Sequence, residues 1–235
     1  MGGTLRTRVP DEAWQCQALA RLWTMLDKPN ATRDDLAELE TRYKAYTHWA
    51  QAQLIELPET EIWAQWLVPD LPRERIAPRA QALTLAWRNR NGRALLKPDA
   101  ASTLAEMHRR GYRLGLISNT ISAVNVPRVL AENHVRDFFE VVVLSSVCGI
   151  RKPDPEIFWR ATRALDIAPA QCAYLGDRIS RDVVGARRAG FARALIIEPR
   201  GAPRADEQNQ IEKPDAVIHA LSELLEIFPP RSQGD

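Results

Sequence analysis

The chain has 235 residues, of which 45% are hydrophobic and 26% charged, and its formal net charge is +2. This composition is typical of a water-soluble globular protein of one large or two modest domains. It excludes a disordered chain, which has fewer apolar residues, and a collagen-like chain, which needs far more than the 11 glycines found here. The 32 basic and 30 acidic residues are mixed along the chain, which argues against a nucleic-acid-binding protein.

The apolar segments are all shorter than the ~20 residues that a membrane-spanning helix requires, so we expect no contact with a membrane. The opening residues, MGGTLRTRVPDE, lack the apolar stretch of a secretory signal, and we therefore expect a cytoplasmic protein. The three cysteines, Cys16, Cys148 and Cys172, are odd in number and share no metal-ligand spacing, which fits a reduced compartment. The sequence leaves the oligomeric state open.

The chain up to residue 92 predicts helices. Apolar residues recur every three or four positions in 11–28, and again in 33–55 after a capping Thr32. Shorter helices are predicted near 59–67 and 73–88, because prolines separate these stretches. Six of the seven tryptophans lie in this half, and we expect them to form the core of a small helical bundle. The alternative, that one or two of them line a pocket, stays open.

After Gly92, short apolar strands alternate with amphipathic helices. The predicted strands are 113–118, 139–145, 172–176 and 193–197, and the predicted helices are 99–110, 122–133, 154–166, 180–189 and 216–227. The strands are continuous apolar runs, as in parallel sheets that are covered on both faces. We therefore expect an α/β fold with a doubly wound parallel sheet. Residues 199–214 are predicted to be a loop, and 229–235 a loose tail.

Polar residues follow three of these strands. Ser118-Asn119-Thr120 ends the first, Arg151-Lys152 comes after the second, and Gly176-Asp177 ends the third, with Asp182 five positions further on. Ligands of open parallel sheets bind beyond the carboxyl ends of the strands. Taken singly, each has an ordinary structural interpretation: Ser118-Asn119 as a turn, Lys152 as a solvated side chain and Asp177 as a helix cap. Together they are the groups that hold a phosphate and a divalent metal.

The order of these motifs resembles that of a known family. LGLISN (114–119), RKPDPEIF (151–158) and YLGDRISRD (174–182) look like motifs two, three and four of the haloacid dehalogenase superfamily of hydrolases. The predicted helical residues 10–92 lie between the first and second motifs, where one subclass of this family inserts an α-helical cap. The resemblance thus implies four parts: a remnant of the first core motif (1–9), an α-helical cap domain (10–92), an α/β core domain (93–228) and a tail (229–235).

The first motif of that family departs from its usual form, DxDxT, whose leading Asp is the nucleophile. Aligned on Gly3-Thr4-Leu5, Gly2 replaces the second Asp, and the nucleophile would immediately precede Met1. One interpretation is that the start codon is assigned too late; the others are a catalytically inactive relative and a chance match. Without the central first strand, both of its neighbours would keep unpaired backbone groups, at ~1–3 kcal/mol each against a total stability of ~5–15 kcal/mol. This favours the late start.

The resemblance implies a Mg²⁺-dependent phosphatase of small phosphorylated metabolites, in which the missing Asp forms an aspartyl-phosphate. The residues that the motifs match, in their implied roles, are Ser118, Asn119, Gly3 and Thr4 for substrate binding, Ser118 and Lys152 for catalysis, and Asp177, Asp182 and the Gly2 carbonyl for the metal. Gly2 lacks the proton-transferring carboxyl of the second Asp, a contribution of ~10²–10⁴-fold, which implies a slow enzyme or a substrate with a good leaving group.

Two rival functions stay open. A dehalogenase of the same family attacks carbon and needs no metal, and the two acids Asp177 and Asp182 argue against it. The other rival is a catalytically inactive relative that binds phosphorylated ligands or a protein partner through its tryptophan-rich helical half.

Overall fold

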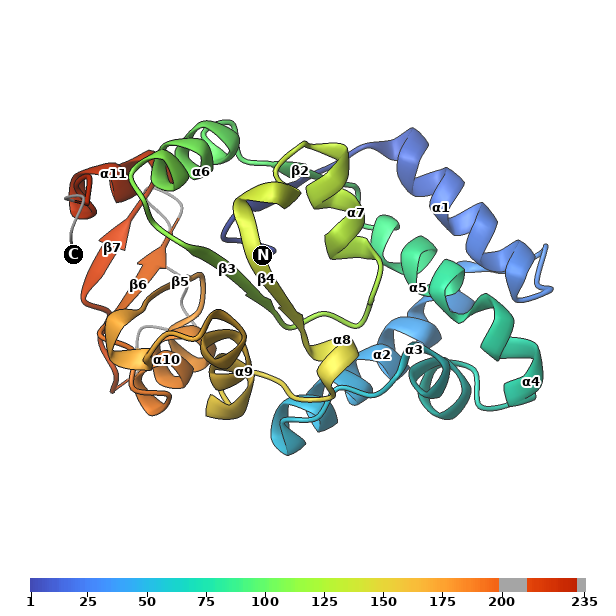
Figure 1. The fold of residues 1–235 in the computed structure, drawn as a ribbon. Helices are drawn as coiled ribbons and strands as arrows, with labels where there is room; N and C mark the ends of the chain where they lie inside the picture. The colour runs from blue at the N-terminus through green and yellow to red at the C-terminus, as the bar shows by residue number, and fades with distance from the viewer. Residues whose placement is uncertain (199–210, 232–235) are drawn as a thin grey trace.

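The computed structural model describes residues 1–198 and 211–231. Most of the predicted loop 199–214 and the end of the predicted tail 229–235 therefore lie outside the described residues. Figure 1 shows a helical part, formed by α1 to α5, beside a part in which strands and helices alternate. None of the helices in the described ranges is both long and apolar enough to cross a membrane.

The helical part confirms the predicted helices. α1 (Glu12–Met25) begins at Asp11, whose side chain accepts a hydrogen bond from the Trp14 amide, and α2 (Arg33–Gln53) begins at Thr32 with a capping box. The two shorter predicted helices are each interrupted. The segments are α3 (Glu59–Glu61) with a π-helical turn at Ile62–Leu67, and α4 (Arg73–Ile76) with a 3₁₀ turn before α5 (Ala80–Asn89).

Five of the six tryptophans predicted to form the core of the bundle belong to it or pack against it, and Trp14 lies outside this cluster. Trp63 and Trp87 are fully buried, and their rings meet edge to face with centroids 6.3 Å apart. The indole nitrogen of Trp63 donates a hydrogen bond to Thr84 Oγ1 at 2.9 Å, so its one polar group is satisfied. Tyr46 and Leu22 belong to the same buried core.

The second part contains the predicted alternation of strands and helices, although several elements differ from the prediction. The strands are β2 (Arg93–Leu96), β3 (Leu114–Ser118), β4 (Phe139–Leu144), β5 (Ala173–Gly176), β6 (Arg193–Ile197) and β7 (Ala216–Ile218). The helices are α6 (Ala100–Arg109), α7 (Asn125–Glu132), α8 (Ser145–Cys148), α9 (Pro155–Leu165), α10 (Val184–Arg188) and α11 (Leu224–Ile227).

The prediction of a single helix over 216–227 was wrong. Its first residues form β7, because Val217 and Ile218 are β-branched and pair in parallel with β6; only α11, after a 3₁₀ turn, is helical. The predicted helix 180–189 is a π-helical turn at Ile179–Val183 followed by α10. An antiparallel ribbon of β1 (Arg6–Val9) and β2 joins the two parts of the molecule and was not predicted.

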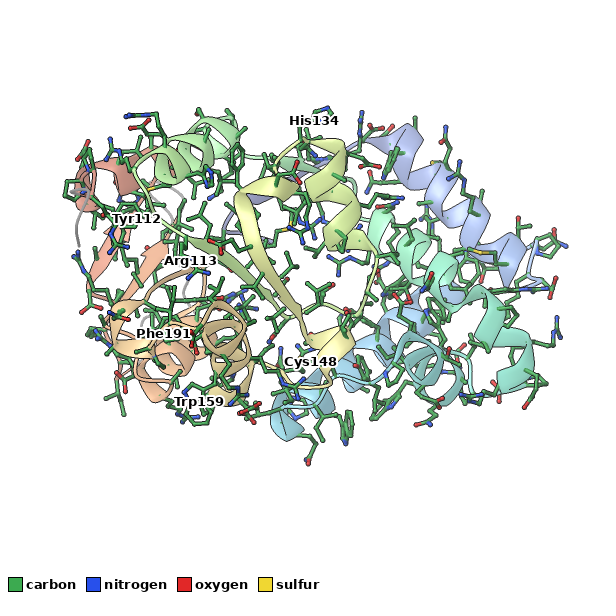
Figure 2. All side chains as sticks on the ribbon, viewed as in Figure 1. Tyr112, Arg113, His134, Cys148, Trp159 and Phe191 are labelled. Atoms are coloured by element: carbon green, nitrogen blue, oxygen red, sulfur yellow. The ribbon has the colours of Figure 1, made fainter. Side chains whose placement is uncertain are left out.

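The parallel strands stand in two groups, β3-β4 and β5-β6-β7. Within residues 1–198 and 211–231, no strand hydrogen-bonds to the facing edges of β3 and β5. A cavity of about 630 Å³ opens between these strands, and the side chains around it are largely apolar. Met1 and Leu5 line it, as do Tyr112, Arg113 and Phe191, which Figure 2 labels. This cavity forms a slot that separates the two halves of the sheet.

Candidate active site

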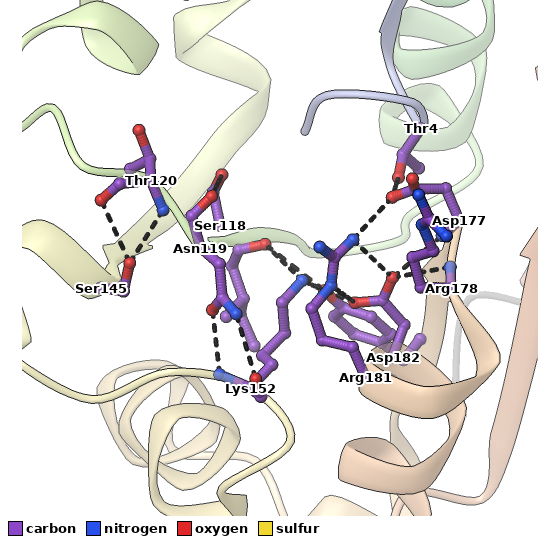
Figure 3. A network of polar contacts seen from close by, with 12 residues as sticks. Thr4, Ser118, Asn119, Thr120, Ser145, Lys152, Asp177, Arg178, Arg181 and Asp182 are labelled. Atoms are coloured by element: carbon purple, nitrogen blue, oxygen red, sulfur yellow. Dashed lines mark hydrogen bonds and ion pairs between the residues drawn. The ribbon is translucent and has the colours of Figure 1, made fainter. Parts of the chain in front are cut away.

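The ends of β3 and β5 hold the buried charges of the candidate site, which Figure 3 shows. The Nζ of Lys152 lies 2.7 Å from Oδ1 of Asp182, and both side chains are almost completely buried. The same ammonium donates hydrogen bonds to the Ile117 carbonyl at 3.3 Å and to the Tyr174 hydroxyl at 2.6 Å. Lys152 is thus held between the end of β3 and the end of β5.

Asn119 fixes the position of the lysine backbone. Its side-chain nitrogen donates to the Lys152 carbonyl at 3.0 Å, and its side-chain oxygen accepts from the Lys152 amide at 2.9 Å. Ser118, the preceding residue and the last of β3, is buried. The structure therefore brings Ser118, Asn119 and Lys152 together.

The first residues of the chain lie against Asp177. The hydroxyl of Thr4 donates to Asp177 Oδ1 at 3.3 Å. Gly3 has a positive φ of +81°, and a Cβ there would lie only 2.3 Å from Asp177 Oδ2, so the close approach requires glycine. Gly2 is exposed and forms a β-bridge with Arg6; none of the described contacts joins it to either acid.

Asp182 closes the turn that follows β5. Its Oδ2 accepts hydrogen bonds from the amides of Asp177 at 3.0 Å and Arg178 at 3.1 Å. Gly176 makes this possible, because a Cβ there would lie 2.2 Å from the Asp182 Cβ. Asp182 is therefore built into the loop and fixes the backbone that carries Asp177.

Arg181 contacts both acids, a feature that sequence reasoning missed. Its Nη2 lies 3.0 Å from Asp177 Oδ1 and 3.2 Å from Asp182 Oδ2. Tyr174 was missed as well, since a tyrosine in an apolar strand is usually a packing residue; it does pack on Phe158, with ring centroids 4.9 Å apart. The only signal for either residue was its place inside YLGDRISRD.

Burial and charge act against each other at this site. Burial alone would raise the pKa of the Asp182 carboxyl, but the charges of Lys152 and Arg181 hold that pKa below its ordinary value. For Lys152 burial is the larger effect, and it lowers the pKa of the ammonium although Asp182 opposes the shift. Asp182 is therefore a stable anion near neutral pH.

The donors of this site suit a divalent cation that is held by a single carboxylate, not one that is enclosed by protein ligands. No group of three or more His, Cys, Asp or Glu side chains within the described ranges is placed to hold a metal ion. Both oxygens of Asp182 already face Lys152, Arg181 and backbone amides. The carboxylate of Asp177 lies beside Gly3 and Thr4, at the start of the chain. Mg²⁺ is commonly held by one or two carboxylates together with water and substrate phosphate oxygens, and this donor set fits that mode.

The comparisons with known proteins now identify the family. A model of haloacid dehalogenase-like hydrolases matches residues 1–190, and the chain belongs to this family. The family resemblance of the motifs is thereby confirmed, as is the α/β core with a helical cap.

Two curated relatives carry phosphatase names. The chain is 31% identical to the phosphoserine phosphatase of Thermus thermophilus over 209 residues, which cover 80% of this chain and 81% of that protein. It is 35% identical to the glyceraldehyde 3-phosphate phosphatase of Methanopyrus kandleri over 137 residues. That second match spans 55% of each chain, so the chain matches only about half the length of this relative.

Solved structures share the fold. A HAD phosphatase from Thermococcus onnurineus superposes with a TM-score of 0.62 at 24% identity, covering 98% of this chain and 95% of that one. A 2-haloacid dehalogenase from Pseudomonas syringae superposes with a TM-score of 0.68 at 22% identity, covering 97% and 94%. Because both phosphatases and dehalogenases have this architecture, the fold alone does not choose between the two reactions.

Proposed function

We propose that this chain is a Mg²⁺-dependent phosphatase that acts on small phosphorylated metabolites. The observation that carries the proposal is the buried ion pair of Lys152 with Asp182, which Arg181 links to Asp177 at the strand ends beside Ser118. Positive charge next to a carboxylate pair suits a transferring phosphoryl group, whose charge is spread over three oxygens. The phosphatase names of both curated relatives support this choice over carbon–halogen hydrolysis.

Each residue has a proposed role. Ser118 and the Asn119 amide bind phosphoryl oxygens, with Gly3 and Thr4 on the other side of the phosphoryl group, and Lys152 balances the negative charge. Asp177 and the Gly2 carbonyl would hold Mg²⁺, and Asp182 supports the metal by fixing the loop that carries Asp177. Bound Mg²⁺ would supply further positive charge to the phosphoryl oxygens.

We further propose that the nucleophile is an aspartate immediately before Met1. Met1 is buried. Its amino group lies close enough to Lys152 and Asp177 for both charges to affect the pKa of that group. The residue before it would therefore stand in the site, and the strand before that residue would fill the slot between β3 and β5. A carboxylate oxygen of this Asp attacks phosphorus, the substrate alkoxide leaves, and water then cleaves the aspartyl-phosphate.

We propose that residues 10–92 are the cap, which selects the leaving group. Residues 93–228 are the proposed core domain, and residues 1–9 are the proposed remnant of the first core motif. With Gly2 in place of an acid, the leaving alkoxide receives no side-chain proton at that position, so substrates with good leaving groups are favoured.

Two forms of the protein test the proposal: the chain as it stands, and the chain extended by the in-frame codons upstream of Met1. The extended protein should release phosphate from p-nitrophenyl phosphate with Mg²⁺, and changing the added Asp to Asn should abolish release. Halide release without Mg²⁺ would instead support the dehalogenase. Phosphate binding without turnover in the extended form, or a stop codon directly before Met1, would support the inactive relative.

A further inference from the structure

The segment between α2 and α3 carries a buried carboxylate into the core. Glu56 is 2% exposed, although it belongs to the helical part of the chain. Its backbone is tied to the loop that precedes Lys152: the Glu56 amide donates to the Gly149 carbonyl at 2.8 Å, and the Arg151 amide donates to the Leu54 carbonyl at 2.9 Å. A short stretch of helical-part backbone is thus paired with a core loop.

The Glu56 carboxylate has three partners. Tyr46 donates its hydroxyl to Oε1 at 2.5 Å, Ser145 donates its hydroxyl to Oε2 at 2.8 Å, and Arg151 forms an ion pair with Oε2. The charge is therefore fully compensated within a buried polar network.

The partners of Glu56 lead directly to the candidate site. Ser145 accepts a hydrogen bond from the Thr120 amide at 2.8 Å, and Thr120 follows Ser118 and Asn119. Arg151 is bonded covalently to Lys152, and Lys152 is held by the Asn119 side chain at 2.9 and 3.0 Å. The links form a closed ring that runs from Glu56 to Ser145, Thr120, Asn119, Lys152, Arg151 and back to Glu56.

A second glutamate strengthens this junction. Glu59, three residues along, is also buried and accepts a hydrogen bond from the Ala123 amide at 3.3 Å. Two carboxylates of the helical part therefore hold the loop that follows β3.

We propose that Glu56 is a positioning residue, which acts through Ser145 and Arg151 to fix the Ser118-Asn119 loop and Lys152 in their places. The idea rests on the proposed function for its consequence, since those residues are the proposed phosphoryl-binding groups. In this proposal the helical part is a structural component of the phosphoryl site, because the ring closes only when Glu56 contacts Ser145 and Arg151.

Amide hydrogen exchange in the ligand-free chain tests the positioning directly. In Glu56→Gln, the amides of Thr120 and Lys152 should exchange at least about tenfold faster, while those of β6 stay unchanged. The matched control is Glu61→Gln, a glutamate at the end of α3 that forms an ion pair with Arg73 at 2.9 Å, and it should leave both loops unchanged. If exchange becomes faster throughout the protein, or if the exchange of the Thr120 and Lys152 amides does not change, the proposal is overturned in favour of a merely structural role.

A second variant guards against misfolding of Glu56→Gln. Ser145→Ala breaks the link to Thr120 while the Glu56–Arg151 pair remains, and it should loosen the Thr120 amide but spare Lys152. Unchanged exchange at Thr120 would contradict the ring.

Calorimetry with inorganic phosphate and Mg²⁺ tests the consequence. Folded Glu56→Gln should bind phosphate roughly tenfold more weakly than the unaltered chain. Equal affinity would overturn the positioning role. If neither the unaltered chain nor its extended form binds phosphate, the proposed function fails, and the exchange data still decide the role of Glu56.

Discussion

Lys152 Nζ and Asp182 Oδ1 lie 2.7 Å apart, and this buried ion pair joins the loops that follow two separate groups of strands. Lys152 comes from the segment after β4, whereas Asp182 follows β5. Since β3 and β5 share no strand hydrogen bonds, the ion pair is one of the contacts that hold the two halves of the sheet together. In the proposed function, the same pair faces the phosphoryl group of a substrate.

Removing the lysine should destabilise the fold more than a surface change would. In Lys152→Met, Asp182 loses its closest cation, and we expect the free energy of unfolding in urea at pH 7 to fall by about 3 kcal/mol. Arg181 limits the loss, because it still contacts Asp182. The double variant Lys152→Met/Asp182→Asn should recover part of that stability, since no unpaired charge remains. A double variant less stable than the single one would contradict the ion-pair explanation.

Arg181 should weaken the binding of a divalent cation, because its guanidinium already contacts Asp177 at 3.0 Å and Asp182 at 3.2 Å. Arg181→Met removes this competing positive charge, so the affinity for Mg²⁺, measured by calorimetry without substrate, should rise about three- to tenfold. Arg188→Met, at an exposed position on α10, is the matched control and should change it less than twofold. Weaker binding in Arg181→Met would mean that the arginine assists the metal.

Sequence patterns that span a whole element predicted the fold well. The apolar stripe of α1 and the continuous apolar run of β3 each identify an element without its neighbours. β7 was missed because Ala216–Ile218 is too short to show a period, and its pairing with β6 depends on distant residues. The β1-β2 ribbon was missed for a similar reason, since Arg6 pairs with Leu96.

The sequence predicted those parts of the candidate site whose position depends only on the topology of the sheet. The carboxyl ends of parallel strands share an edge, which places Ser118 and Asp177 at that edge. The contact of Glu56 with Ser145 depends on packing between separate parts of the chain. The contacts of Arg181 with Asp177 and Asp182 are close in sequence, but they depend on the conformation of the turn after β5. No local pattern distinguishes these residues from ordinary surface charges, so they emerge only from the structure.

Gly176 should tolerate no side chain. A Cβ at this position would lie 2.2 Å from the Cβ of Asp182, and Asp182 cannot move without breaking its hydrogen bonds to the Asp177 and Arg178 amides. We expect Gly176→Ala to lower the free energy of unfolding by about 1–3 kcal/mol or more. Gly2→Ala is the control, because a Cβ there meets nothing within 4 Å; its unfolding should change by less than ~0.5 kcal/mol. Equal effects of the two changes would exclude the steric explanation.

Glu59 should make the stability of the protein fall as the pH rises. Burial raises the pKa of its carboxyl above the ordinary 4.5, so the unfolded chain releases this proton at a lower pH than the folded one. Between pH 4.5 and the raised value the unfolded state binds fewer protons, and the free energy of unfolding declines. Glu59→Gln removes this titration. Its stability relative to the unaltered chain should therefore increase with pH from about 4.5 upward, in urea denaturation at matched ionic strength.

Glu106 provides a control of opposite sign for the same measurement. Hydrogen bonds from Arg109 and Arg110 lower the pKa of its carboxyl to about 2. Ionised Glu106 therefore contributes stability above pH 4.5, and this contribution is lost as the pH falls toward 2. Glu106→Gln should be less stable than the unaltered chain at pH 6, and the difference should shrink at pH 3. If Glu59→Gln follows this same direction, or shows no pH dependence, then burial does not control the titration of Glu59.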